Sequence, residues 1–270
     1  HVMFGHCYKR QSGWQKLLER FRNGGGTLYD LEYLVHKNSK RVAAFGYWAG
    51  FAGAAIGLKL WLAQKRNNAP EALNIKKTYR KKTLIRELKS ELESFSNDVN
   101  DYPLAMVLGS MGRVGSGAYD ILNILGLRVT KWDIKETIKR NKFPEILLHD
   151  LFVNCIQANP KTPVFLKQEV LAVKRKLSVI SDISCDPNSP YNPIPLYKAS
   201  HTFNKPFVRV SPEPNVLDIT AIDNLPSLLP YESSEDFSSQ ILPYVLGFEG
   251  KHRDVWARAE DVFHYHLQKI

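Results

Sequence analysis

Four glycines, at positions 109, 112, 115 and 117, follow directly on the apolar run 105–108. An apolar helical stripe comes next, and then a strand-like run at 127–132 that ends at Asp133. A strand, a glycine turn, a helix and a second strand ending in an acid form the order that a dinucleotide needs. The glycines permit a sharp turn and a close backbone approach. A pyrophosphate would then lie at a helix N-terminus, where N–H groups and the helix dipole favour negative charge.

Asp133 lies 24 residues after Gly109. A carboxylate at that place accepts hydrogen bonds from a ribose 2′-OH and repels a 2′-phosphate, which predicts NAD rather than NADP as cofactor. The spacing of Gly109, Gly112 and Gly115 is looser than G-x-G-x-x-G, and a glycine-rich turn without a ligand is the alternative interpretation. The flanking strand, helix and acid favour the nucleotide.

The composition indicates a globular protein with room for one large or two modest domains. The chain has 270 residues, of which 44% are hydrophobic and 24% charged, as in ordinary soluble proteins. Its net charge of +10 could indicate nucleic acid, but the basic residues are scattered or clustered only at 76–82. We therefore interpret that cluster as a solvated linker or helix face and expect no nucleic-acid partner. A basic surface also attracts anionic substrates and cofactors.

The cysteines and the apolar segments indicate in which cellular compartment the protein is expected. Cys7, Cys155 and Cys185 are odd in number and lack metal-ligand spacing, so we expect free thiols, a reducing, cytoplasmic compartment and no metal site. The last residues, 267–270, are not a clear peroxisomal signal, and no signal peptide opens the chain. The uncharged run 42–58 resembles a membrane helix but is short of a span, and we expect a buried helix and no membrane partner.

The pattern of apolar runs predicts an α/β fold. Strands are expected at 2–5, 27–35 and 40–45, helices at 14–21, 83–96 and 232–270, and a linker at 64–82. Between 104 and about 225, apolar runs at 104–108, 127–132, 151–156, 177–182 and 216–222 alternate with helical segments, which predicts a parallel sheet with crossover helices. The proline-rich segment 182–195 is expected to be a rigid loop. Ligands bind at the carboxyl ends of such strands.

Several stretches coincide with one family. They are Phe4–Lys9, Gly26–Glu32, Arg41–Gly46, Gly112–Ala118, Lys131–Asp133, Asn192–Pro195 and Asp223–Pro230. In these stretches the chain resembles the fungal-type saccharopine dehydrogenases that form L-lysine with NAD, over nearly its whole length. This family is related to alanine dehydrogenases and transhydrogenases. The resemblance implies two Rossmann-like domains with a cleft between them, here 1–45 with 232–270 for substrate and catalysis, and 46–231 for NAD. It also implies roughly a third of a domain before His1.

The resemblance implies oxidation of saccharopine to L-lysine and 2-oxoglutarate with NAD. We expect a monomer. A histidine suits the proton transfers, because its unperturbed pKa of about 6.5 lies near working pH. His6 would be this acid–base group and Glu32 the acid that tunes it. Substrate would be bound by Gln11, Arg41, Phe45, Ser184, Cys185 and Asp186. The cofactor would be bound by Lys40, Gly109, Gly112, Arg113, Gly115, Asp133, Thr137, Gln157, Ile183, Ile222, Asp223, Asn224 and Leu225.

Alternatives remain for these residues and for the whole chain. His6 could be a strand histidine bound to a carbonyl, Glu32 a solvent-facing carboxylate, and the proline-rich loop a plain turn. The family commonly has arginine at the position of Lys40, histidine at that of Asn224 and arginine at that of Tyr231, and its paired catalytic lysine, upstream of the histidine, has no counterpart in this sequence. The missing lysine and the differences at Asn224 and Tyr231 favour a nucleotide-binding remnant without catalysis as the second hypothesis. A related amine or alanine dehydrogenase with another substrate is the third.

Overall fold

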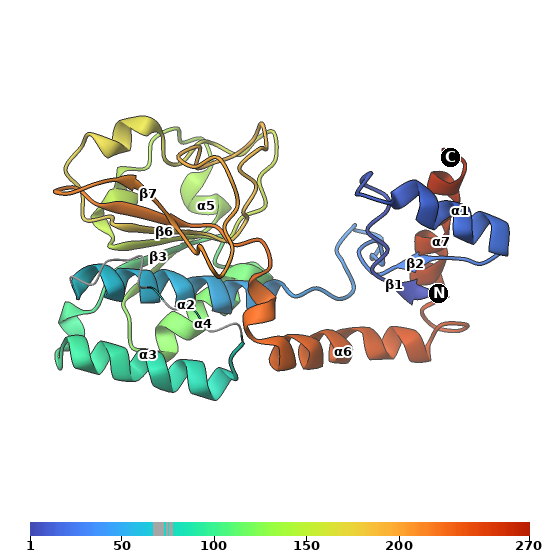
Figure 1. The fold of residues 1–270 in the computed structure, drawn as a ribbon, viewed down its shortest axis with the longest axis horizontal. Coiled ribbons are helices and arrows are strands. Elements are labelled where there is room, and N and C mark those ends of the chain that lie inside the picture. Colours follow the sequence, from blue (N-terminus) through green and yellow to red (C-terminus); the bar gives the residue numbers. More distant parts are fainter. Residues whose placement is uncertain (67–72, 74, 76–77) are drawn as a thin grey trace. The chain divides into compact units, whose positions relative to one another are not determined.

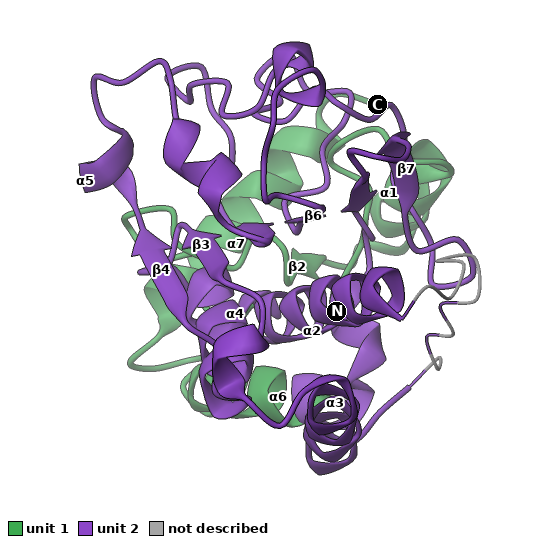
Figure 2. Cartoon of the chain, turned by 90° about the vertical axis from the view of Figure 1, so that its left-hand side faces the viewer, with its two compact units in different colours: residues 1–44, 234–270 green, residues 45–233 purple. Residues whose placement is uncertain are grey.

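The structure is a computed structural model that describes residues 1–66, 73, 75 and 78–270. The chain forms two compact units, coloured separately in Figure 2. Unit 1 consists of His1–Ala44 and Ser234–Ile270, and unit 2 of Phe45–Ser233. Each unit has its own hydrophobic clusters.

Unit 2 is built on a six-stranded sheet. Its strands are β3 (Ala105–Leu108), β4 (Val129–Trp132), β5 (Leu151–Asn154), β6 (Val179–Asp182), β7 (Val208–Ser211) and β8 (Leu217–Thr220). They lie in the order β4-β3-β5-β6-β8-β7. All neighbouring pairs are parallel except β7 with β8, which is antiparallel. The order reverses beside β3, because β4 lies on one side of it and β5 on the other. Ligands of open α/β sheets bind at such a switch point.

The two faces of the sheet are covered differently (Figure 1). Alternate residues of each strand point to opposite faces. Val107 and Val153 therefore pack into one cluster together with α2 (Gly46–Lys65), α3 (Lys81–Phe95) and α4 (Arg113–Ile124). Met106 and Phe152 pack into a second cluster, which is closed by connecting segments and short turns. Every residue of β3, β5, β6 and β8 is buried, as expected for central parallel strands.

Helix α2 confirms the buried helix expected from the run 42–58. It is apolar around its circumference because the sheet, α3 and α4 surround it. Its approach to α4 depends on glycine. A Cβ added to Gly50 would lie 1.8 Å from the carbonyl oxygen of Val114, and one added to Gly117 would lie 1.9 Å from that of Tyr47. No described helix is long and apolar enough to cross a membrane.

The five runs predicted as strands between 104 and 222 are confirmed, with shorter bounds. The crossover helices are only partly confirmed. A full helix joins β3 to β4, but β4 is followed only by α5 (Ile134–Thr137) and a 3₁₀ turn at Pro144–Leu148, and β5 by another at Gln168–Leu171. Apolar side chains of loops, such as Phe165 and Ile194, cover this face in place of helices. Strand β7 was not predicted.

The predicted linker 64–82 can be compared with the structure only at its ends. Helix α2 continues to Lys65, and α3 begins at Lys81. Pro70 and part of the basic cluster 76–82 lie outside the described residues.

Unit 1 has two short parallel strands, β1 (Val2–Met3) and β2 (Tyr29–Asp30), and the helix α1 (Trp14–Gly24). The expected helical segment 232–270 is two helices, α6 (Pro230–Leu246) and α7 (Arg253–Leu267), and α6 begins in unit 2. Leu18 and Leu28 pack on Phe263 of α7. A second cluster joins Leu34 and Val42 to the same helix through Trp256.

The strands expected at 27–35 and 40–45 were wrong in extent. Only Tyr29 and Asp30 form a strand, and Val35 and Arg41 meet in a single antiparallel bridge. The reason is local. The carboxylate of Asp30 accepts a hydrogen bond from the amide of Glu32, and the carbonyl of Asp30 accepts one from Tyr33. These bonds form an Asx-type turn that competes with extended backbone.

Candidate functional site

The glycine loop between β3 and α4 is shaped for close backbone contact. Gly109 has φ +81°, a conformation that favours glycine and turns the chain off β3. A Cβ on Gly115 would lie 2.1 Å from the carbonyl oxygen of Gly109, so this glycine lets α4 begin against the loop. Gly112 is exposed, and an added Cβ there would meet only the Gly109 oxygen, at 3.4 Å. The loop therefore has an open side at Gly112.

Helix α4 begins with backbone donors. Gly112 is the N-cap residue, and its carbonyl accepts a hydrogen bond from the amide of Ser116 at 2.9 Å. The first amides of an α-helix point away from its hydrogen-bond ladder and form the positive end of its dipole. Strand, loop and helix are thus arranged as in sites where a helix N-terminus receives an anion.

Asp133 lies beside this loop at the end of β4. One carboxylate oxygen accepts a hydrogen bond from the amide of Met111, at 3.0 Å, and the other from the amide of Ile134, at 2.9 Å. Glu136 in turn accepts a hydrogen bond from the amide of Asp133, at 2.7 Å, which completes a capping box. The carboxylate is therefore fixed next to the glycine loop. Met111 of the glycine loop and Ile134 and Ile138, which follow Asp133 in the chain, are exposed apolar side chains, 84%, 71% and 59% accessible.

The other predicted cofactor residues of unit 2 follow the carboxyl ends of the parallel strands. Thr137 lies in α5 and donates its hydroxyl to the carbonyls of Asp133 and Ile134. Gln157 follows β5 and is exposed. Ile183 follows β6, and residues 222–225 follow β8. The structure thus brings to one edge of the sheet residues that are widely separated in the sequence.

The loop after β6 is held from three sides. The hydroxyl of Ser184 donates to the carbonyl of Ile156, and the amide of Ile183 donates to the carbonyl of Asn154 at 3.0 Å. The thiol of Cys185 donates to the carbonyl of Ala221, also at 3.0 Å. Cys185 has φ +48°, which is strained for a residue with a side chain. Burial and the nearby carboxylate of Asp182 raise the pKa of the Cys185 thiol to about 12.

In unit 1, Glu32 joins two cations. Its Oε1 accepts hydrogen bonds from Nζ of Lys9 at 2.6 Å and from the guanidinium of Arg41 at 2.7 Å. Burial alone would raise the pKa of Glu32, but Lys9 and Arg41 outweigh burial and hold the pKa below its usual value. The Glu32 side chain is only 15% exposed, whereas those of Lys9 and Arg41 are 57% and 45% exposed. The cations are accessible, and carboxylates are the groups that such cations bind.

His6 is exposed, and a buried carboxylate lies beneath its segment. It has φ +50° and its ring stacks on Phe4, with ring centroids 6.0 Å apart. Asp30 is 1% exposed and accepts hydrogen bonds from the amides of Gly5, at 3.2 Å, and Glu32, at 2.9 Å. Burial raises the pKa of Asp30, although these amides and nearby His6 oppose the shift. One carboxylate therefore fixes the backbone next to both proposed catalytic residues.

The remaining predicted residues of this region lie close by in the chain. The side-chain oxygen of Gln11 accepts a hydrogen bond from the amide of Lys9, at 3.0 Å. Lys40 is exposed and precedes Arg41, while Phe45 is the first residue of unit 2.

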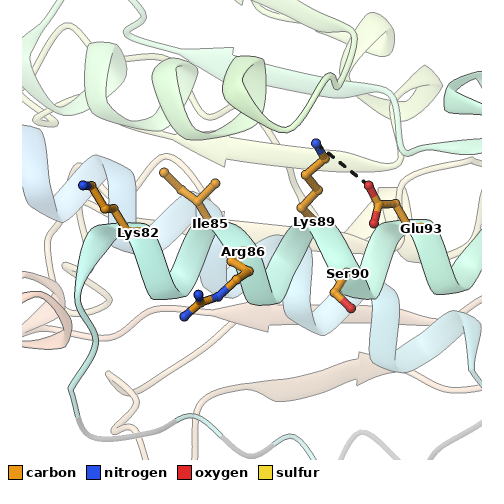
Figure 3. A pocket seen from close by; sticks show the side chains of 6 residues that line it. All are labelled: Lys82, Ile85, Arg86, Lys89, Ser90 and Glu93. Atoms are coloured by element: carbon orange, nitrogen blue, oxygen red, sulfur yellow. Dashed lines mark ion pairs between the residues drawn. The ribbon is translucent and has the colours of Figure 1, made fainter.

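A pocket of about 450 Å³ lies elsewhere, along α3 (Figure 3). All six lining residues belong to that one helix. The side chains of Lys89 and Glu93, four residues apart on it, form a 3.9 Å ion pair. None of them is a predicted site residue.

Three further residues, which were not predicted from the sequence, contact the proposed site residues or the segments that carry them. Lys9 pairs with Glu32, Asp30 fixes the segment of His6, and Asp182 contacts the loop after β6. The sequence signal for Lys9 was its position three residues after His6. The two aspartates were missed because the partners that make them buried restraints, Gly5 for Asp30 and Asn154 with Tyr197 for Asp182, lie far away in the sequence.

Comparison with known proteins shows which family this chain is similar to. The chain is 42% identical to the saccharopine dehydrogenase [NAD(+), L-lysine-forming] of Candida glabrata, over 98% of its own length and 73% of that protein. It is 41% identical to the enzyme of the same name from Schizosaccharomyces pombe, over 100% of the chain and 76% of that protein. The chain belongs to the L-lysine-forming saccharopine dehydrogenase family. The sequence resemblance is thereby confirmed. No family model matches the chain.

More distant relatives of this saccharopine dehydrogenase family member were also found, one by comparison of structures and one by comparison of sequences. A solved L-alanine dehydrogenase superposes with a TM-score of 0.52 over 96% of this chain and 68% of that one, at 14% identity. This likeness confirms the α/β, Rossmann-like fold class. The mitochondrial α-aminoadipic semialdehyde synthase of Rattus norvegicus is 24% identical over 91% of the chain, but only 34% of that protein is covered.

Proposed function

We propose that this chain carries out the NAD-dependent oxidation of saccharopine to L-lysine and 2-oxoglutarate, with unit 2 binding the cofactor and unit 1 contributing the acid–base and carboxylate-binding residues. The observation that carries the proposal is the glycine loop with Asp133 hydrogen-bonded to it, in a member of this family. The single sheet edge formed by the strand ends supports the same assignment.

The residues present fit NAD. The glycine loop offers an open backbone surface and helix N-terminal donors for the pyrophosphate. Asp133 offers a fixed carboxylate for ribose hydroxyls, and its negative charge disfavours a 2′-phosphate. The exposed side chains of Met111, Ile134 and Ile138 offer apolar surface for the adenine ring. Residues 183 and 222–225 are proposed as further contacts, together with Lys40, Arg113, Thr137 and Gln157.

The proposed chemistry assigns roles to the residues of unit 1. NAD, when bound, accepts a hydride from the carbon next to the secondary amine of saccharopine. His6 would take the proton of that amine first and then move protons as water adds to the resulting imine. Glu32 neutralises part of the positive charge of Lys9 and Arg41. Arg41 presents a planar fork that binds a substrate carboxylate through two hydrogen bonds. Gln11, Phe45 and residues 184–186 are the proposed remaining substrate contacts.

The proposal is tested by absorbance at 340 nm, an assay of NADH consumption. The protein is mixed with NADH, and lysine and 2-oxoglutarate are added singly and together. We expect oxidation of NADH only when both are present, and little with NADPH. A panel in which another amine and oxo acid is turned over faster would reassign the substrate. NADH binding without turnover on any pair would favour a binding remnant, and absence of NADH binding would refute the cofactor assignment.

A further inference from the structure

Asp182, at the carboxyl end of β6, is a buried carboxylate that accepts hydrogen bonds from two side chains. It is 2% exposed. Its Oδ1 accepts a hydrogen bond from the side-chain amide of Asn154, at 2.9 Å, and its Oδ2 accepts one from the hydroxyl of Tyr197, at 2.7 Å. Burial raises the pKa of Asp182, and the nearby backbone amides of Ser184 and Cys185 oppose this shift.

These partners connect Asp182 to the segments that carry the proposed ligand contacts. Asn154 ends β5, and the backbone that follows it packs on the glycine loop, since an added Cβ on Gly109 would lie 3.1 Å from the carbonyl carbon of Cys155. Tyr197 comes from the proline-rich stretch that follows the loop. Asp182 lies at the end of β6 and directly precedes the loop 183–186. It therefore links this loop to the end of β5 through Asn154 and to the far side of the proline-rich segment 182–195 through Tyr197.

The loop needs such a restraint because its backbone is strained. Cys185 has φ +48°, and strained residues persist only where the surroundings hold them in place. Two sets of hydrogen bonds provide this restraint. The thiol of Cys185 donates to the carbonyl of Ala221, and the side chains of Asn154 and Tyr197 fix Asp182, which directly precedes the loop. A loop fixed before a ligand arrives loses less conformational entropy on binding.

We propose that Asp182 is a positioning residue that preorganises residues 183–186 for ligand binding, so that Ile183 meets the cofactor and Ser184–Asp186 meet the substrate. This inference rests on the function proposed above. Asp182 itself is buried and touches no ligand in this scheme. Its effect is carried by the backbone of the loop.

Asp218 offers a matched control. It is also a fully buried aspartate of the same sheet, 0% exposed, and it accepts hydrogen bonds from Arg209 and Gln64. However, it pairs with Val179, the first residue of β6, and so lies at the opposite, amino end of the strands. Substitution of either aspartate removes a buried carboxylate, but only Asp182 contacts the ligand loop.

The experiment compares Asp182→Asn, Tyr197→Phe and Asp218→Asn with the unsubstituted protein. Each protein is assayed for melting temperature, for the NADH dissociation constant by fluorescence, and for KM and kcat with lysine and 2-oxoglutarate. We expect both aspartate variants to lower the melting temperature. Asp182→Asn alone should raise the NADH dissociation constant and the KM for lysine about tenfold, with kcat changed less, because a displaced loop misplaces its contacts. Tyr197→Phe should act in the same direction by about threefold, since it removes one hydrogen bond of several.

Equal ligand constants for Asp182→Asn and Asp218→Asn, or unchanged constants for Asp182→Asn, would overturn the inference and leave the proposed function intact. If Asp182→Asn does not fold, Tyr197→Phe decides alone, and unchanged ligand constants for it overturn the inference. Failure of the unsubstituted protein to bind NADH would instead overturn the proposed function, and this inference with it.

Discussion

The carboxylate of Asp133 accepts a hydrogen bond from the backbone amide of Met111, with Oδ2 and N 3.0 Å apart. The acid proposed to contact the ribose is therefore also a restraint on the glycine loop proposed to hold the pyrophosphate. Recognition of the sugar and conformation of the loop depend on one side chain.

Substitution Asp133→Asn tests this coupling. The amide nitrogen of asparagine cannot accept a hydrogen bond, and the negative charge that disfavours a 2′-phosphate is lost. We expect the NADH dissociation constant to rise about tenfold, the equivalent of a charged hydrogen bond, and the preference for NADH over NADPH to fall. Fluorescence titration with both cofactors measures these changes. Asp98→Asn, which alters an exposed cap at Val99–Asp101, is the control and should leave both constants unchanged.

Asp30→Asn tests whether the carboxylate of Asp30 holds the backbone next to His6 and Glu32 in unit 1. Asp30 accepts hydrogen bonds from the amides of Gly5 and Glu32, and an asparagine can accept only one of them well. We expect kcat to fall about tenfold through misplacement of the proposed catalytic groups. The NADH dissociation constant should stay the same, because all proposed cofactor residues except Lys40 belong to unit 2. The exposed Asp254, paired with Arg258, provides the control variant Asp254→Asn. Unchanged kcat in Asp30→Asn would contradict the assigned role.

Gly50→Ala tests the packing of α2 on α4. The new methyl group would lie 1.8 Å from the carbonyl oxygen of Val114, which is backbone and can move only with its helix. We expect a loss of about 3 kcal/mol or more in the free energy of unfolding, at the upper end of overpacking effects. Urea denaturation measures it. The same change at Gly24, where an added Cβ meets nothing within 4 Å, should be close to neutral. Equal effects at the two sites would refute the close approach.

The pH dependence of stability should report on Lys59. Its ammonium is 6% exposed and donates to Glu87 at 2.6 Å and to Glu91 at 2.8 Å. Burial alone would lower the pKa of Lys59, but the two glutamates outweigh burial and raise the pKa above 10.5. Because the folded-state pKa is raised, the stabilisation is fully present below the pKa of the unfolded chain, about 10.4, and is lost as pH rises through the folded-state pKa.

The corresponding measurement compares the protein with Lys59→Met by urea denaturation at two alkaline pH values. The gap in unfolding free energy between them should shrink as the pH rises from about 9 to about 11. Lys89→Met provides the control, because Lys89 is 67% exposed in a 3.9 Å pair with Glu93 and should show little gap at either pH. A gap for Lys59 that does not change with pH would refute the assigned ion-pair contribution.

Local sequence was sufficient for the elements of unit 2 that are built from neighbouring residues. Gly109, Gly115 and Asp133 were predictable because turn, helix start and strand end follow one another along the chain. The buried helix α2 was predictable from its apolar run. Strand β7 and the missing crossover helices were not, because loop side chains such as Phe165 and Ile194 cover the sheet only after long segments have folded back.

The family, the glycine loop, the acid at the end of β4 and the positions of the parallel strands could be predicted from the amino-acid sequence. The fold was needed to show that Asp30 and Asp182 are buried hydrogen-bond acceptors, that Lys9 shares Glu32 with Arg41, and that Gly50 faces Val114. The difference comes from distance along the chain. A turn or a helix start is set by residues within a few positions. A buried carboxylate or a glycine contact gains its meaning from partners brought together by packing, and a pattern of neighbours does not record them.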